Sequence, residues 1–224
     1  MSRRAATLAV LVAAALAGCS EPGDEPEGLG GTTGTGTSSA EPDPTEPGST
    51  GTSGNEDSPE PEPSPGFTQP YLPEGEESVI ELATELPIDV PDDATEEETA
   101  VLTAVGRFMA SWDAILFGAD PETARLAETA TDPQFSRLVQ YATESTMDQR
   151  VTVGEPTVVE LMDIQVDDTT AEVDVCITMT NWVEYVGGEA EPLDAVERQV
   201  LTVKDVEGRW LVSDANPKGA TGCS

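Results

Sequence analysis

The clearest periodic pattern in the chain is a helical one that begins at Thr95. Apolar residues follow it at alternating steps of four and three, which places them on one face of a helix. These residues are Val101, Val105, Phe108, Trp112 and Ile115. Thr95 and Glu98 have the spacing of a capping box, and Gly118 is placed to end the helix. The pattern therefore predicts a long helix that packs one face against a core.

Two further helix starts follow. Asp120-Pro121 and Asp132-Pro133 each combine a residue that caps helices with a proline suited to the first helical position. We expect a short helix to end at about Thr129 and a third helix to end near Gln149.

After Arg150 the spacing changes to that of strands. Strands are predicted at about 157–166, 170–186, 196–206 and 209–214, and the short turns between them make consecutive strands antiparallel neighbours. The second strand alternates most regularly. One of its faces is expected to pack on the helices, and it carries Ala171, Val173, Val175, Ile177, Met179, Asn181, Val183 and Tyr185. The other face carries Cys176 and Trp182 among polar residues.

The first 94 residues show neither the helical nor the strand spacing of apolar residues. Residues 5–16 are apolar apart from Thr7 and follow Arg3 and Arg4, which is typical of an export signal and too short for a permanent membrane span. Residues 20–94 contain 19 acidic and no basic residues, and their composition predicts a disordered tether. A glycosylated Thr/Ser-rich stalk is the alternative. The last, less polar part of the tether is expected to lie partly against the domain.

The stretch Leu16-Ala17-Gly18-Cys19 resembles the lipobox of bacterial lipoproteins. The resemblance implies diacylglycerol on the Cys19 sulfur, cleavage before Cys19 and further acylation, with palmitate-type chains, at the new amino group. Two or three such chains hold a protein stably on a bilayer. We therefore expect a signal peptide at 1–18, a lipidated tether at 19–94 and a domain at 95–224, anchored to the extracytoplasmic face of the cell membrane. Plain secretion with a chance cysteine is the alternative.

Charge and residue usage narrow the functional classes. The formal net charge of −34 argues against binding to nucleic acid, which needs clustered Lys and Arg. The chain has no histidine, and its acids and cysteines show no metal-binding spacing, so no metal or cofactor is expected. Export implies an oxidising compartment, so Cys176 and Cys223 are candidates for a disulfide. Two free thiols are the alternative.

Three helices followed by strands, with a Gly208-Arg209-Trp210 turn into the last strand, resemble the nuclear-transport-factor-2-like superfamily. The chain is also similar to actinobacterial lipoproteins that place such a domain after an acidic tether. The resemblance implies an α+β fold in which three N-terminal helices pack on a curved, cone-shaped four-stranded antiparallel sheet. It also implies a pocket between helices and sheet, without fixing an activity.

Three hypotheses for the function follow. The favoured one is a non-catalytic domain that binds a small apolar ligand or an envelope protein. The second is a small-molecule isomerase or hydrolase that uses an Asp/Tyr pair. The third is an assembly subunit that forms a homodimer through its sheet. The weak catalytic candidates are Asp113, Tyr141 and Tyr185, and the pocket candidates are Trp112, Asn181 and Arg198.

Overall fold

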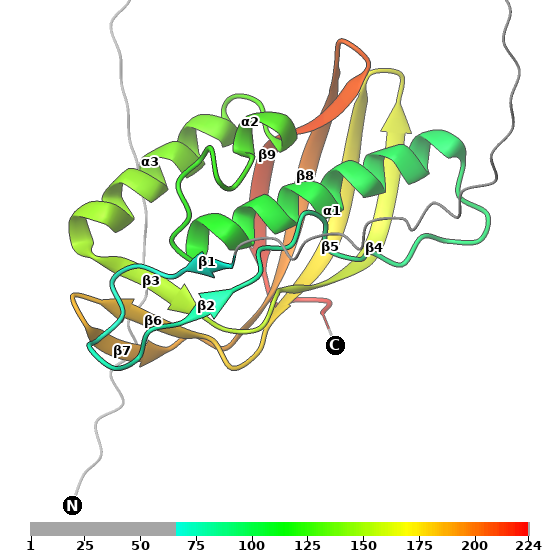
Figure 1. The fold of residues 1–224 in the computed structure, drawn as a ribbon. Coiled ribbons are helices and arrows are strands. Elements are labelled where there is room, and N and C mark those ends of the chain that lie inside the picture. The colour runs from blue at the N-terminus through cyan, green and yellow to red at the C-terminus, as the bar shows by residue number, and fades with distance from the viewer. Residues whose placement is uncertain (1–65, 224) are drawn as a thin grey trace, which may run out of the picture. The chain divides into compact units, whose positions relative to one another are not determined.

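A computed structural model describes residues 66–223 of the chain (Figure 1). The expected signal peptide, the lipidation site Cys19 and the tether up to residue 65 lie outside the described residues. Within the described part, no helix combines the length and the apolar character needed to cross a bilayer.

The predicted long helix is α1, which spans Glu96–Leu116. The capping box is confirmed: the Thr95 N–H donates to the Glu98 carboxylate at 2.7 Å, and the Glu98 N–H donates to the Thr95 hydroxyl at 3.1 Å. Most of the apolar face is fully buried, including Val101, Val105 and Phe108. Two shorter helices follow, α2 at Leu126–Thr129 and α3 at Gln134–Asp148.

The main sheet is antiparallel and has the order β4-β5-β8-β9. Its strands are β4 (Val158–Asp167), β5 (Thr170–Met179), β8 (Ala195–Val206) and β9 (Arg209–Gly219). Helix α1 lies across one face of this sheet (Figure 1). The inward residues of β5 are buried, as the alternation predicts, and form a core with α1; they are Ala171, Val173, Val175, Ile177 and Met179.

Two smaller sheets complete the described fold. One has the order β3-β6-β7 and consists of β3 (Arg150–Val153), β6 (Val183–Val186) and β7 (Glu189–Pro192). The other is a ribbon of two residue pairs between β1 (Phe67–Thr68) and β2 (Val79–Ile80).

The expectation of three helices on one four-stranded sheet is wrong, although the α+β class holds. The described residues lie more in strands than in helices, α1 is the main helix, and the strands form three sheets. The predicted strand 170–186 is broken at Asn181, whose φ of 57° cannot continue a strand. The chain then pairs with β3 instead of β8. Helix α2 begins only at Leu126, because Arg125 before it adopts a left-handed φ of 56°, and it ends before Ala130, which is extended.

Part of the segment 66–94 packs against the helices and sheets. Leu86 is 3% exposed, and its N–H donates to the carbonyl of Gly106 at 3.0 Å. A Cβ on Gly106 would lie 2.5 Å from the Leu86 carbonyl oxygen, so only glycine allows this close approach in the middle of α1. The contact between Leu86 and Gly106 therefore supports the expectation that part of the tether segment packs on the domain.

Cys176 and Cys223 are joined in a disulfide, with their Cα atoms 5.7 Å apart. Cys176 lies on the face of β5 opposite its inward residues, where the sequence places it. The bond fastens the C-terminal tail to the second strand of the main sheet.

Candidate functional site

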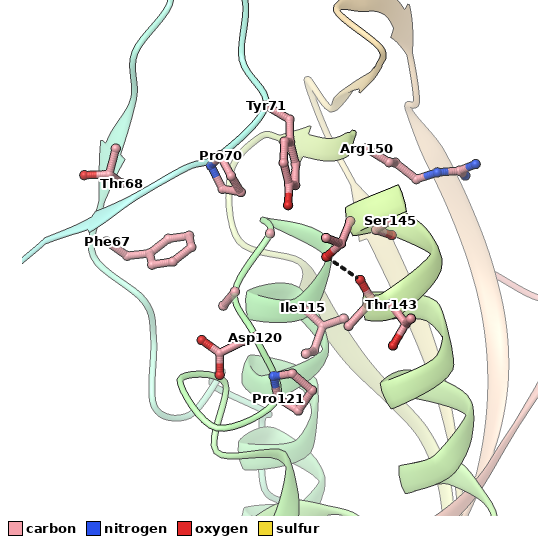
Figure 2. Close-up of a pocket in the computed structure, with 14 residues that line it drawn as sticks. Phe67, Thr68, Pro70, Tyr71, Ile115, Asp120, Pro121, Thr143, Ser145 and Arg150 are labelled. Atoms are coloured by element: carbon pink, nitrogen blue, oxygen red, sulfur yellow. Dashed lines mark hydrogen bonds between the residues drawn. The ribbon is translucent and has the colours of Figure 1, made fainter. Parts of the chain in front are cut away.

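A cavity lies where the end of α1, the helix α3 and residues 67–71 meet (Figure 2). We call it the α1–α3 pocket. Its volume is about 360 Å³, at the small end of the range for ligand sites. Phe67, Tyr71 and Ile115 supply apolar surface, and α3 contributes Ala142 and Ser145.

Glycine at position 118 makes this arrangement possible. Gly118 has a φ of 93°, which ends α1, and a Cβ there would lie 2.6 Å from the Pro70 side chain. The incoming segment is fixed by Gln69, whose side-chain amide donates to the Thr152 carbonyl at 2.8 Å. The Tyr185 hydroxyl donates to Glu76 at 2.7 Å and fastens the loop that follows. The wall formed by residues 67–71 is thus attached at several points.

Ser145 is the unusual polar group in this pocket. The residue is 7% exposed, and its Oγ has no hydrogen-bond partner of good geometry among the described residues. The hydroxyl contacts the phenol of Tyr141, and this contact lowers the Tyr141 pKa against the larger effect of burial, which raises it. Because a buried hydroxyl without a partner costs free energy, Ser145 is a polar group that a ligand can satisfy.

The charged residues at the rim are already engaged. Asp120 accepts hydrogen bonds from the N–H groups of Thr123 and Glu122, at 3.0 and 2.9 Å, and the bond from Thr123 is the main reason that its pKa is lowered. Arg150 pairs with Glu184 at 3.3 Å and with Asp148 at 3.5 Å. Its guanidinium points away from the cavity (Figure 2). The pocket therefore offers no free positive charge to an anionic ligand.

Asp113, the first catalytic candidate, does not line the α1–α3 pocket. It is 3% exposed and accepts from the Thr157 hydroxyl at 2.6 Å and from the Thr157 N–H at 2.8 Å. Burial raises the pKa of its carboxyl to about 6, against the lowering effect of these two hydrogen bonds. Both carboxylate oxygens accept hydrogen bonds from Thr157, the residue before β4, so Asp113 has a structural role at the start of this strand.

The other candidates also lie outside the α1–α3 pocket. Tyr141 packs behind it in a small apolar cluster. The pKa of Tyr185 is raised because its hydroxyl donates to the Glu76 carboxylate. Asn181 is exposed in the turn after β5 and so does not face the core. Arg198 pairs with Asp174 and lowers that carboxyl's pKa.

The tryptophans are placed differently from the sequence interpretation. Trp182 was expected on a polar face, but it is 1% exposed, and its indole N–H donates to the Glu155 carbonyl at 2.7 Å. Trp112 stacks on it with ring centroids 6.3 Å apart. The two rings fill core space between α1 and the turn after β5, which accounts for their presence without a ligand.

Few sequence features point to the residues that line the pocket. Ser145 is an ordinary helical serine, and the composition around Phe67 and Tyr71 is that of the tether. The only available signal was the rising apolar content of the tether's last part. Among residues 66–223, no group of three His, Cys, Asp or Glu side chains could hold a metal ion.

Comparisons with known proteins are distant. No protein-family model matches the chain. The search of curated proteins finds no match either. The intermembrane space region of the chloroplast protein ARC6 is similar in structure, with a TM-score of 0.46 and 13% identity over 56% of this chain and 98% of that one.

Two other solved structures show weaker likeness. A ketosteroid isomerase-like protein from Erwinia carotovora atroseptica has a TM-score of 0.41 and 12% identity over 56% of this chain and 99% of that one. A protein described as a calcium/calmodulin-dependent protein kinase II association domain, from Xanthomonas campestris, has a TM-score of 0.31 and 17% identity over 64% of this chain and 99% of that one. With similarities this distant, no activity is transferred to the present chain.

Proposed function

We propose that this chain is a membrane-anchored, extracytoplasmic binding protein whose domain holds a small, neutral and largely apolar ligand in the α1–α3 pocket. The observation that carries the proposal is the buried, unpartnered hydroxyl of Ser145 in a cavity of about 360 Å³ with apolar walls. Binding sites typically combine apolar walls with a few polar groups that orient the ligand.

The chemistry of the pocket favours a neutral ligand. Ser145 can either donate or accept one hydrogen bond, which suits a carbonyl, an ether or a hydroxyl group. Asp120 lies at the rim of this cavity, so an anion would be repelled locally. The Arg150 guanidinium is already paired with two carboxylates and does not offset this repulsion.

The same geometry favours binding over catalysis. A serine nucleophile needs a base within hydrogen-bond reach, and the chain contains no histidine. Asp113, the carboxyl group with the most strongly raised pKa, lies outside the pocket with both oxygens engaged by Thr157. The Asp/Tyr pair considered from the sequence therefore has no support as a catalytic unit at this cavity.

The cellular location is proposed from the sequence. The run that ends at Cys19 is the basis for a lipid anchor, and the disulfide between Cys176 and Cys223 suits an oxidising compartment outside the cytoplasm. A clickable palmitate analogue should label the parent chain and not a Cys19→Ala variant, which should also leave the membrane fraction. An unlabelled parent chain, or a variant that stays membrane-bound, would rule out the anchor.

The assignment of the α1–α3 pocket as a binding site can be tested by placing a large side chain in the cavity. Thr146 is exposed on α3 and lines the cavity, so Thr146→Phe should block binding of the neutral fluorescent probe N-phenyl-1-naphthylamine. Met147, the next residue, is 77% exposed and is absent from the pocket lining, so Met147→Phe is a matched control. Equal probe binding by the two variants would contradict the assignment. Native mass spectrometry of the chain purified from its own membrane would identify the natural ligand.

A further inference from the structure

Three arginines gather on a second region of the surface, although acids dominate the chain. The sequence has 44 acidic and ten basic residues. Arg107, Arg125 and Arg209 nevertheless border two adjoining hollows, and we call these three residues the arginine cluster. Arg107 lines both hollows, Arg125 lines the first and Arg209 lines the second.

The hollows are built for a polar ligand. The first has a volume of about 400 Å³ and lies between residues 82–85, α1 and α2. The Ser111 and Thr129 hydroxyls in its wall already donate, to the Arg107 carbonyl and to Ser111 respectively, so the free donors are the guanidinium groups. The second, of about 310 Å³, lies beside the turn between β8 and β9 and includes Trp210. Hydroxyl groups and guanidinium groups therefore surround a space that an aromatic side chain borders on one side.

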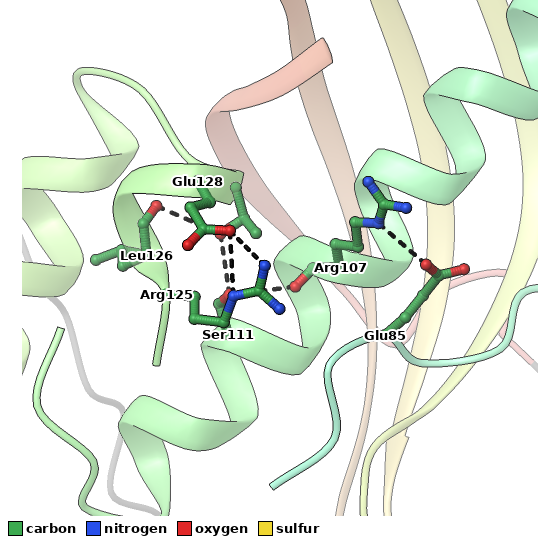
Figure 3. A network of polar contacts seen from close by, with 7 residues as sticks. Glu85, Arg107, Ser111, Arg125, Leu126 and Glu128 are labelled. Carbon is green, nitrogen blue, oxygen red and sulfur yellow. Dashed lines mark hydrogen bonds and ion pairs between the residues drawn. The ribbon is translucent and has the colours of Figure 1, made fainter. Parts of the chain in front are cut away.

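Two carboxylates hold the guanidinium groups while leaving part of each free (Figure 3). Glu85 accepts from Nε of Arg107 at 3.1 Å, and no hydrogen bond from the two Nη atoms of Arg107 to another described residue is found. Glu128 accepts from Nε and Nη2 of Arg125, which leaves Nη1. Guanidinium groups fixed in this way present a preset donor edge, the geometry that suits bidentate binding of a phosphate.

The backbone at Arg125 supplies an independent observation. Its φ of 56° is left-handed, a conformation that glycine adopts without cost and that other residues adopt at a penalty. Arg125 is more than half exposed and its ion pair with Glu128 is equally exposed, so the pair contributes little to folding. A long cationic side chain is thus held at a strained position where it adds little to stability.

We propose that the arginine cluster binds the phosphate groups of a phosphorylated small molecule, with Arg107 shared between two phosphoryl groups. The site has three positive guanidinium groups and two negative carboxylates, those of Glu85 and Glu128. It therefore carries an excess of one positive charge, although the chain as a whole is acidic. This site is separate from the α1–α3 pocket, with which it shares no lining residue. Because binding is electrostatic, it should weaken as salt rises.

The test is a calorimetric titration of the full chain with inorganic pyrophosphate at low salt and at physiological salt. The parent should give a saturable heat, and Arg107→Gln should weaken binding about tenfold or more, as expected for the loss of charge-assisted hydrogen bonds. Arg137 pairs with Asp214 and lines neither hollow, so Arg137→Gln should bind like the parent. No saturable heat, or an equal loss in the Arg137 variant, would overturn the proposal.

Arg125→Gly separates binding from folding. Glycine relieves the left-handed strain, so the variant should melt at or above the parent's temperature while its affinity for pyrophosphate falls about tenfold. Unchanged affinity for pyrophosphate would exclude Arg125 from the site and would refute the proposal that these three arginines form it. Thr146→Phe should leave pyrophosphate binding intact, which distinguishes this site from the proposed apolar one.

Discussion

Asp113 is a buried carboxyl whose ionisation should be visible in the stability of the whole fold. Burial raises its pKa from 3.8 to about 6. The native state therefore holds this proton more tightly than the unfolded chain does. The resulting stabilisation is fully present below about pH 4 and is lost as the pH rises through 6, the folded-state pKa.

The magnitude follows from the size of this shift. A shift of about two pKa units at about 1.4 kcal/mol per unit gives about 3 kcal/mol. Asp113→Asn removes the titration and keeps the shape, because the amide oxygen can accept from the Thr157 N–H and the amide nitrogen can donate to the Thr157 hydroxyl. Between pH 4 and pH 7 the variant should therefore gain most of this amount, about 2 kcal/mol of stability, relative to the parent.

The assay is urea denaturation of the full chain at several pH values between 4 and 7, followed by tryptophan fluorescence from Trp112 and Trp182. Asp120 provides a control of opposite sign, since hydrogen bonds lower its pKa: relative to the parent, Asp120→Asn should lose stability as the pH rises toward 4 and should change little between pH 4 and pH 7. A parent–variant difference for Asp113 that does not change with pH would refute the reasoning. It would mean that the Thr157 hydrogen bonds fully offset burial.

Three other changes test the site, the disulfide and the packed segment. Ser145→Ala should stabilise the ligand-free chain by about 1 kcal/mol, because it removes an unpartnered buried hydroxyl, and should weaken binding of the naphthylamine probe; a less stable variant would contradict this. Cys223→Ser opens a disulfide whose cysteines are 47 residues apart and should cost at most about 4 kcal/mol in urea denaturation. Leu86→Ala should cost about 2–5 kcal/mol in the same assay, since Leu86 is 3% exposed, and a near-zero cost would show that residues 66–94 do not pack on α1.

Local sequence patterns predicted those helices and strands whose formation depends mainly on neighbouring residues. The capping box at Thr95 and the buried alternation from Ala171 to Met179 depend on neighbouring residues and on one period, so the sequence alone predicts them. The break at Asn181 does not follow from the pattern, because apolar and polar residues keep alternating on both sides of the turn. Strand β7 is exposed at every position, so no hydrophobic pattern marks it.

The candidate site was harder to predict than the fold. The importance of Ser145 arises only when Phe67 and Tyr71, more than 70 positions earlier in the chain, close over it. Asp113 borders the apolar face of its helix in the sequence and is buried in the structure, but its partner Thr157 is 44 positions away. Lipidation of Cys19 and dimerisation through the sheet stay predictions.

One wall of the α1–α3 pocket comes from residues that precede α1 in the chain. Phe67, Thr68 and Tyr71 belong to that wall, and only two residue pairs tie β1 to β2. A shortened protein that starts at Thr95, the boundary suggested by composition, would keep α1 and all four strands of the main sheet but lack this wall. Such a fragment would have an incomplete α1–α3 pocket, so the choice of starting residue decides whether a recombinant domain can bind a ligand in it.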